Sequence, residues 1–392
     1  MRRTSIAVWA VVILSGSLAS SRAQAPLTDA EDIAKVNGFF RASSPDALKC
    51  SLDLWSPSLG FDFRFVTSYA IGCRLAVFEG KQVTLINYVR VTPEGSAPAL
   101  LASVYRIPEM TPEMLRLAGG NLEKMKGEFA MSGAFCLGEG RYSVEVLVKD
   151  SQGRTFRKKW RLHVAARHSE RDVELAMKPL TVRAIDQSSW QTVSSQKRGN
   201  LRLTILLDAA PINPFQSRLH AWDRAFLLEC IDSLLRQTPH QSVRLVAFNL
   251  EQQRELFRAD PFDSAAFLHL SQVLQEIETA SISVQALKQR NSPLLLATLA
   301  DEEIKAADRS DAVLFLGPTS RMDVNIGAGI FSEKRPLNPP FFYFEYFPWP
   351  GSDFPDVIER LTKAADGKTY QIHSPVELDQ AIEKMLAQLK QE

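Results

Sequence analysis

The sequence predicts a multidomain fold, in which an all-β sandwich is followed by a larger α/β domain with a doubly wound sheet. Residues 48–164 contain short stretches of alternating apolar and polar residues separated by turn residues, which is typical of antiparallel strands. From residue 201 onward, apolar strand-like runs alternate with segments of helical periodicity. Such alternation predicts an open, mostly parallel sheet with helices on both faces.

The clearest element of the first half is a predicted β-hairpin. Alternating apolar residues at 142–148 and 156–164 flank the turn 150–153, which ends in Gly153. About seven short strands within roughly 120 residues favour a sandwich. The earlier strands are expected at residues 48–55, 61–69, 74–78, 83–91 and 100–107.

Residues 138–144, Gly-Glu-Gly-Arg-Tyr-Ser-Val, resemble the tyrosine corner of immunoglobulin-like domains. In such a corner the tyrosine hydroxyl, here that of Tyr142, returns to nearby backbone and fixes a connection between the sheets. Antibody domains have a cysteine two residues later, where this chain has Val144. The resemblance implies an immunoglobulin-like sandwich over residues 46–165.

The second half, residues 200–392, begins with a nearly continuous apolar run at 201–208, as expected for a strand buried on both faces. The polar stretch before it, 166–199, predicts a linker, although 180–185 has the pattern of an edge strand. A helix is predicted at 221–236, with Trp222 in the apolar stripe. Further strands are expected at 243–248, 255–257, 312–316, 341–346 and 370–372, and further helices at 263–278, 293–308, about 353–367 and from 374.

This order of elements resembles a von Willebrand factor A-type domain over residues 201–389. In that family the first strand leads into a D-x-S-x-S loop that binds Mg²⁺, and a threonine and an aspartate from two other loops complete the site. Here the first loop is Asp208-Ala-Ala-Pro-Ile, Leu316 stands in place of the second aspartate, and Ser292 matches the threonine. One carboxylate and one hydroxyl are a poor site for Mg²⁺, so we predict a degenerate relative without a metal or other cofactor.

Without the ion, a partner has to be held by side chains of the same rim, because loops at the carboxyl ends of parallel strands surround a crevice. A purely structural role is the alternative, in which Asp208 caps a neighbouring helix and Pro318 and Pro350 shape turns. The aromatic run at 341–346 is expected to be a buried strand, and it ends before Phe347 and Trp349. The candidate binding residues are Asp208, Ser292, Pro318, Phe347 and Trp349, in a rim formed by 209–217, 291–293, 318–323 and 348–353.

Residues 1–23 predict export. Arg2 and Arg3 precede an apolar run at 6–14. Ser21 and Ala23 fit the −3 and −1 positions of a signal-peptidase site. Because the run is short for a bilayer span, cleavage is favoured over a retained anchor, and we expect a secreted or periplasmic protein without membrane insertion. The N-terminal segment 24–45 is expected to hold a helix at 28–41 capped by Thr28.

Two smaller patterns leave alternatives open. Cys50 and Cys73 each alternate with apolar residues on predicted strands, which permits a disulfide between them but fits two buried free thiols equally well. On the last predicted strand of the sandwich, one face carries only basic side chains. They protect an exposed strand from pairing or form a docking stripe for an acidic surface; the residues are Arg157, Lys159, Arg161 and His163.

The remaining patterns favour a binding protein over an enzyme. Without residues 1–23 the formal net charge changes from +1 to −2, so nucleic-acid binding is not expected. The sequence contains no H-E-x-x-H, G-x-S-x-G, Walker or G-x-G-x-x-G motif. We therefore predict an exported, non-enzymatic protein-binding or scaffold protein whose partner is another protein at the cell envelope or outside. The alternatives are a metal-dependent adhesion module with unusual ligands and an envelope-directed hydrolase.

Overall fold

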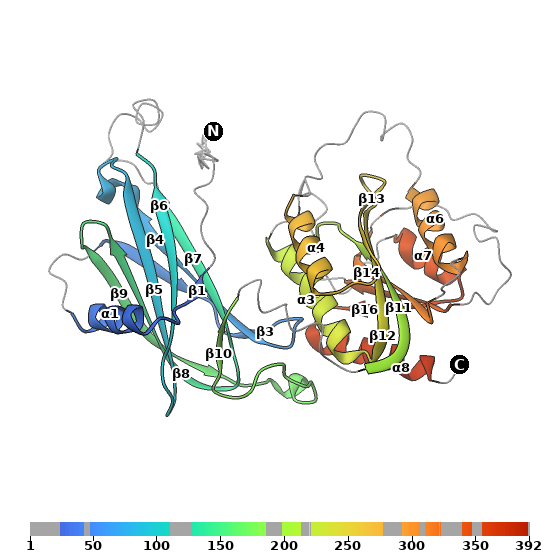
Figure 1. Ribbon diagram of the computed structural model, residues 1–392, viewed down its shortest axis with the longest axis horizontal. Coiled ribbons are helices and arrows are strands. Elements are labelled where there is room, and N and C mark those ends of the chain that lie inside the picture. The colour runs from blue at the N-terminus through green and yellow to red at the C-terminus, as the bar shows by residue number, and fades with distance from the viewer. Residues whose placement is uncertain are drawn as a thin grey trace, which may run out of the picture.

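The computed structural model describes residues 24–42, 48–109, 128–185, 198–212, 219, 221–276, 292–305, 310–320, 322, 339–346 and 355–390 (Figure 1). The first half of the chain forms two β-sheets and the second half forms an α/β sheet, so the chain is multidomain. The predicted signal peptide, residues 1–23, lies outside the described residues. Among the helices described, none is both long and apolar enough to cross a membrane.

The two antiparallel sheets of the first half pack face to face. Their common core contains Val89 and Val146 from one sheet and Tyr69 and Phe135 from the other, and none of these is more than 1% exposed. The first sheet has the order β1 (Ala25–Pro26), β6 (Ala99–Ile107), β5 (Val83–Pro93), β8 (Gly140–Asp150), β9 (Thr155–Val164). The second has the order β10 (Val182–Ala184), β7 (Glu128–Leu137), β4 (Phe65–Arg74), β2 (Cys50–Leu54), with β3 (Ser58–Leu59) also paired to β4.

In this half one predicted strand is wrong, and one strand was not predicted. The residues expected as a strand at 74–78 form a short 3-10 helix, η1 (Leu75–Phe78), because the chain turns here from one sheet to the other and buries Phe78. The long strand β7 has no counterpart among the predictions. Its pattern is weakened by Gly133, which the fold requires because an added Cβ would lie 2.2 Å from the Tyr69 hydroxyl.

Two contacts fix the connections of the sandwich. The hydroxyl of Tyr142 donates a hydrogen bond to the carbonyl of Gly138 at 2.7 Å, so the predicted return of this side chain to the backbone is confirmed. Cys50 and Cys73 are cross-strand partners on β2 and β4 and are joined by a disulfide, which decides between the two alternatives. The predicted hairpin is confirmed in β8 and β9.

Two further segments cover the sandwich. Helix α1 (Ala30–Arg41) lies on the outer face of the first sheet, where Phe40 packs in a cluster with Leu147. Its cap is Asp29 and not the predicted Thr28, because the Asp29 carboxylate accepts the free N–H groups of the first turn. Within the predicted linker, β10 pairs with β7, so the edge strand that the sequence allows at 180–185 is formed.

The second half is a six-stranded sheet with helices on both faces. The strand order is β13 (Arg254–Ala259), β12 (His240–Asn249), β11 (Arg198–Asp208), β14 (Ala312–Pro318), β15 (Phe341–Tyr346), β16 (Lys368–Ile372), and β13 is the single antiparallel strand. The helices α3 (Ala221–Gln237), α4 (Ser264–Glu276) and α8 (Pro375–Leu389) cover one face, and α6 (Ser292–Lys305) and α7 (Val357–Ala364) cover the other.

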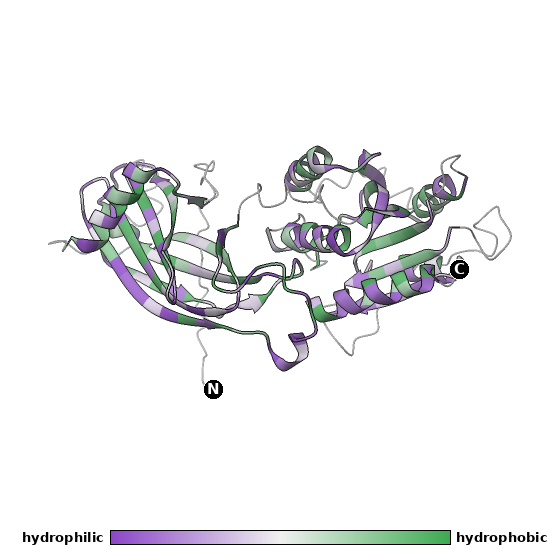
Figure 2. Ribbon diagram, turned by 60° about the horizontal axis from the view of Figure 1, so that its bottom comes forward, coloured by the Kyte–Doolittle hydropathy of each residue, from purple (hydrophilic) through white to green (hydrophobic). Residues whose placement is uncertain are grey.

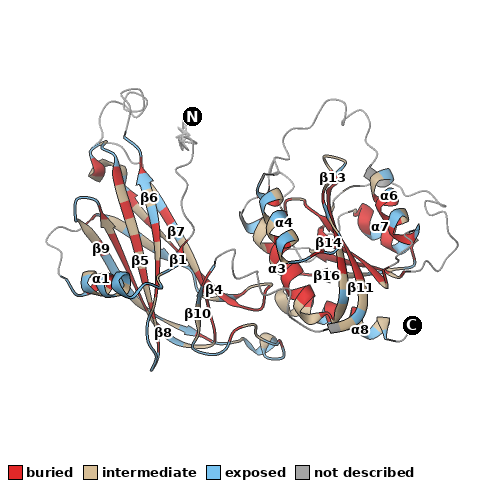
Figure 3. Cartoon of the chain, viewed as in Figure 1, coloured by how far each residue is buried: buried red, intermediate tan, exposed pale blue. Residues whose placement is uncertain are grey.

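Burial explains this arrangement. The residues of β14 are all buried, and Figure 3 shows the middle of the sheet mostly in red, with a tan stretch in β11. Odd-numbered residues of β11, such as Ile205, enter the core under α3, whereas Leu206 enters the core under α6 and α7. Apolar strands with polar-faced helices on both sides are visible in Figure 2. A strand covered on both faces needs apolar residues at nearly every position, which is what the run at 201–208 predicts.

The loop between β3 and β4, residues 60–64, connects the two halves by direct packing. The ring of Phe61 lies edge-on to Phe226 of α3 and to Tyr346 of β15, at centroid distances of 5.0 and 5.5 Å. Phe63 is 1% exposed and belongs to the core of the α/β sheet. The strand predicted at 61–69 therefore begins later, because its first residues are drawn into the neighbouring core.

A buried acid holds this loop to α3. The backbone N–H of Phe61 donates to the carboxylate of Glu229 at 3.1 Å. The backbone carbonyl of Phe61 accepts from the hydroxyl of Ser233 at 2.5 Å. Arg236 donates to the carbonyl of Asp62 at 2.5 Å. Burial raises the pKa of Glu229 to about 8, and the nearby charge of Asp62 contributes to the rise. The junction between the halves therefore contains a buried carboxyl group whose pKa is raised far above its ordinary value.

Candidate functional site

The carboxyl ends of β11, β14 and β15 meet at one rim of the α/β sheet, which is the rim predicted to bind a partner. β11 ends at Asp208, beside β14, and Pro318 at the end of β14 is in register with Tyr346 at the end of β15. Loops that follow parallel strands at such a rim surround a crevice, which is where ligands of open α/β sheets bind.

Asp208 is buried at the centre of this rim, with 1% of its surface exposed. By strict distance and angle criteria neither of its carboxylate oxygens accepts a hydrogen bond within the described residues, but the backbone N–H of Leu250 is directed to it and acts to lower its pKa. Burial raises the pKa of Asp208 well above its usual range, and the charges of Asp356 and Glu251 raise it further. The surroundings thus favour the neutral, protonated carboxyl.

Gly317 allows β14 to pass directly beside this acid. A Cβ added to Gly317 would lie 2.8 Å from the Cβ of Asp208 and 2.9 Å from its backbone oxygen. No side chain fits at such distances, so the packing of the two strands requires glycine. Leu316, which precedes this glycine, is an apolar core residue that is 1% exposed.

Two hydroxyl groups among the described residues at the rim, those of Thr319 and Ser320, are already used in hydrogen bonds. Thr319 donates to Glu345 at 2.8 Å, and the hydroxyl of Ser320 donates to Asp356 at 3.0 Å. Asp356 also accepts the Tyr343 hydroxyl at 3.1 Å and caps the first turn of α7. These bonds tie the ends of β14 and β15 to α7, and they engage the oxygens that a hard cation would need.

The described residues at this rim do not fit the Mg²⁺ site that the resemblance to a von Willebrand factor A-type domain implies. Mg²⁺ needs several oxygen ligands in near-octahedral geometry. Burial raises the pKa of Asp208 and so favours its uncharged form, which is a poor metal ligand. The hydroxyls of Thr319 and Ser320 are directed to other carboxylates. Across the described part of the chain, no three His, Cys, Asp or Glu side chains converge as a metal site. The absence of a bound metal stays a prediction.

Of the five candidate binding residues, two have side chains that the structure describes. Asp208 and Pro318 lie on the rim, but both are buried, and the carbonyl of Pro318 accepts from Tyr343 at 3.3 Å. The ring of Pro318 is therefore part of the sheet and is not offered to a partner. Ser292 begins α6, and its side chain is outside the described residues, as are Phe347 and Trp349 altogether.

Two exposed apolar side chains at the same end of the sheet are not among the binding residues predicted from the sequence. Trp222 is 81% exposed on the first turn of α3, and Leu294 is 58% exposed on the first turn of α6. Asp223 fixes the first of these turns to the loop after β11, because it accepts the N–H of Ile212 at 2.9 Å. The assignment of Trp222 to the buried stripe of its helix is wrong, since its side chain is on the exposed side of a turn whose next residue, Asp223, is buried.

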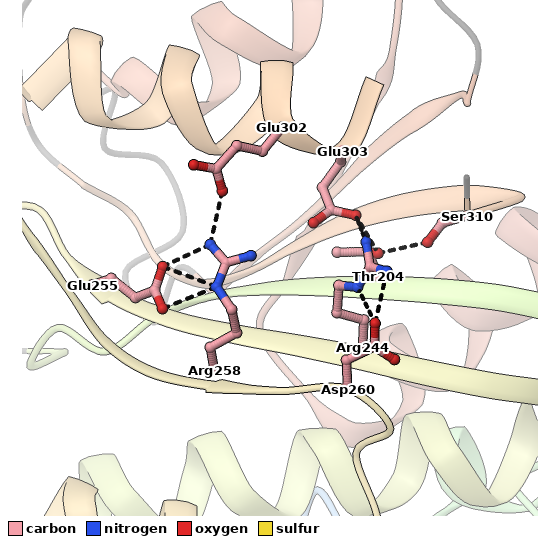
Figure 4. Close-up of polar contacts among 8 residues, drawn as sticks. All are labelled: Thr204, Arg244, Glu255, Arg258, Asp260, Glu302, Glu303 and Ser310. Atoms are coloured by element: carbon pink, nitrogen blue, oxygen red, sulfur yellow. Dashed lines mark hydrogen bonds and ion pairs between the residues drawn. The ribbon is translucent and has the colours of Figure 1, made fainter. Parts of the chain in front are cut away.

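A second polar cluster lies toward the amino end of the same sheet (Figure 4). Glu303 of α6 is 2% exposed, accepts the Thr204 hydroxyl at 2.8 Å and pairs with Arg244 at 3.0 Å. Arg244 also pairs with Asp260 at 2.7 Å. Because this buried acid has both a cation and a hydroxyl donor, the cluster is explained by packing of α6 on the sheet.

Comparisons with known proteins do not assign a family. No family model and no curated protein matches the chain. Among solved structures, an ArnB paralog, VWA2 of Sulfolobus acidocaldarius, is 14% identical and covers 63% of this chain and 51% of its own, with a TM-score of 0.28. An ApaA protein of Bordetella pertussis is 8% identical over 31% of this chain and 98% of its own, with a TM-score of 0.20.

A third similar structure is a β-glucuronidase of Bacteroides uniformis, 10% identical over 78% of this chain and 37% of its own, with a TM-score of 0.20. This chain thus spans about half of the ArnB paralog and less of the glucuronidase. At these TM-scores none of the three carries an argument about function.

Proposed function

We propose that this chain is an exported, non-enzymatic protein-binding protein. Its α/β domain is a von Willebrand factor A-like domain that contacts a partner protein through its carboxyl-end rim without a metal ion, and its sandwich is an immunoglobulin-like spacer. Export rests on residues 1–23. The two domain assignments rest on strand order, because β13-β12-β11-β14-β15-β16 is a doubly wound order with one antiparallel edge, and Tyr142 makes the corner bond to Gly138.

The observation that carries this proposal is the exposure of Trp222 and Leu294. Large apolar side chains that remain exposed at a functional rim are typical of protein contacts, and tryptophan is among the residues most enriched at energetic hot spots. Both helices start at this rim, because α3 follows the end of β11 and the far end of α6 is fixed near Ser310 by Glu303. The two side chains therefore lie at the same end of the sheet, on helices that cover its opposite faces.

The test is a quantitative pull-down with the full mature chain from the exported and envelope fractions of the organism that produces it. We expect Trp222→Ala to weaken capture of the specific partner about thirtyfold, which corresponds to a hot-spot loss of about 2 kcal/mol. Leu294→Ala should weaken the same capture by a smaller factor. Because both side chains are exposed, neither change should lower stability measurably.

The matched control is Trp55→Ala, since Trp55 is 52% exposed but lies on the sandwich. Capture that is unchanged in this variant and lost in Trp222→Ala supports the rim. Equal capture by all three proteins, or capture that depends on Trp55 alone, would contradict the proposal.

A further inference from the structure

A basic cavity of about 700 Å³ lies where the end of α1 meets β2 and the β8–β9 hairpin. Among the described residues that line it, none is an aspartate or a glutamate. This local excess of positive charge is notable in a chain whose formal net charge is only +1. The lining cations are Arg41, Lys49, Lys149, Arg157 and Lys158.

Within the described part of the chain, four of these five cations have no anionic partner. Arg157 pairs with Glu145, and the ammonium of Lys149 lies 3.9 Å from the centre of the Phe39 ring. For the other three, the described residues provide no ion pair. Like charges that surround one cavity repel one another and raise the local potential, so an anion that enters is attracted by all of them.

The cavity opens beside a free sheet edge. β9 is the last strand of its sheet and pairs with β8 through its whole length. On its other side, the only described backbone contact is the N–H of Leu48 donating to the carbonyl of Thr155 at 2.7 Å. A free edge of this kind presents unpaired N–H and C=O groups that accept another strand.

The geometry of the ladder determines which residues face that edge. Since Thr155 directs its carbonyl away from β8, the backbone groups of every second residue after it do the same. These residues are Arg157, Lys159 and Arg161, and their side chains are exposed on the outer face of the sheet. An added strand would therefore place every second side chain opposite a cation, and its alternate side chains beside the half-buried Trp160 and Leu162.

We infer that β9 and the basic cavity at its start bind an extended segment of a partner protein in which acidic and apolar residues alternate. The segment would add as a strand to β9, its acids would pair with Arg157, Lys159 and Arg161, and its end would enter the cavity. Basic residues on an edge disfavour pairing with neutral or basic strands, but they attract a strand that carries acidic residues. The surface lies on the sandwich and does not depend on the function of the rim.

The experiment measures fluorescence anisotropy of a labelled peptide of alternating Glu and Val, about as long as β9, with the full mature chain. We expect binding that weakens as salt is raised, and that falls at least about tenfold for the double variant Lys159→Glu/Arg161→Glu. The affinity of the milder variant Lys159→Gln/Arg161→Gln for the peptide should lie between those of the Glu double variant and the unmodified chain. The matched control is Lys363→Glu/Lys384→Glu, which makes the same charge change at exposed positions of α7 and α8 and should bind as the unmodified chain does.

Two further peptides separate strand addition from simple charge attraction. A peptide of the same composition with all Glu before all Val should bind at least about tenfold more weakly, because its acids cannot face alternate cations. Methylation of the backbone nitrogens at the Glu positions should have a similar effect, because these N–H groups would pair with β9. Equal binding of either peptide, or binding unchanged in both β9 double variants, would overturn the inference.

Discussion

Glu303 and Asp208 are two buried acids at opposite ends of the same α/β sheet, and their surroundings differ in kind. Thr204, the partner of Glu303, lies four residues before Asp208 on β11. This spacing puts the two residues about 13 Å apart along the strand and on the same face of the sheet. Glu303 has a cation, Arg244, and a hydroxyl donor. Asp208 is near two further acids and, by strict distance and angle criteria, accepts no hydrogen bond among the described residues.

This difference separates a structural acid from one that packing does not explain. Breaking a buried ion pair leaves an uncompensated charge, which is strongly destabilising. A buried carboxyl without a partner avoids that cost by remaining protonated. Glu303 is thus expected to hold α6 on the sheet, whereas Asp208 is expected to contribute little and to make the rim less stable as pH rises.

The largest expected effect is at Arg244. Arg244→Met should lower the free energy of unfolding by about 3 kcal/mol, because it leaves Glu303 buried without a cation. Urea denaturation of the full chain, followed by tryptophan fluorescence, measures this change. The control is Arg258→Met, whose partners Glu255 and Glu302 are 35% and 49% exposed and whose loss should cost less than about 1 kcal/mol. A cost at Arg244 no greater than at Arg258 would contradict the comparison.

A smaller effect is expected at the junction acid Glu229, which has partial compensation from the Phe61 N–H and from Arg64. Its folded-state pKa of about 8 lies above the ordinary 4.5, so the folded chain binds this proton more tightly than the unfolded chain. The resulting stability is complete below about pH 4.5 and is lost as pH rises through about 8.

Glu229→Gln should therefore remove part of the pH dependence, because the amide stays neutral and still offers an oxygen to Phe61. We expect the unmodified chain to lose about 2 kcal/mol more than this variant between about pH 6 and about pH 9. Urea midpoints across that range provide the measurement. Glu359→Gln, at an exposed position of α7, is the matched control and should follow the unmodified chain. Parallel pH profiles for all three proteins would show that Glu229 is not perturbed.

The smallest effect is expected from Asp208→Asn. Since burial raises the pKa of Asp208, the unmodified chain loses stability as pH rises from about 3.8 toward that raised value, and the amide does not. At neutral to basic pH the variant should be more stable by about 1–2 kcal/mol. Asp53→Asn, on the exposed face of β2, should change little. A strongly destabilised Asp208→Asn would mean that the ionised carboxylate has a stabilising partner.

Much of the fold was predictable because its strongest patterns come from burial. The run at 201–208 is apolar at nearly every position, since β11 is covered on both faces, and the hairpin β8–β9 alternates because one face lies in the core. The failures are at positions where tertiary contacts override local pattern. Gly133 weakens β7 to make room for Tyr69, and Phe61 and Phe63 leave the sandwich for the neighbouring core.

The site was less predictable than the fold. The sequence indicates that Asp208 ends a buried strand and lacks hydroxyl neighbours in its loop, but it cannot show that Thr319 and Ser320 bind other acids. Trp222 has helical spacing with Phe226, so periodicity places it in the core, and only the position of the first turn exposes it. The partners of Glu303 come from segments distant in sequence, and no local pattern connects Thr204 with Arg244.

The central claim is that the rim around Asp208 works without a divalent cation, and calorimetric titration with Mg²⁺ and Mn²⁺ tests it most directly. The mature chain and its Asp208→Ala variant are titrated side by side. The account predicts heats of dilution alone for both proteins. Micromolar binding to the unmodified chain that disappears in Asp208→Ala would contradict it and favour a metal-dependent adhesion module.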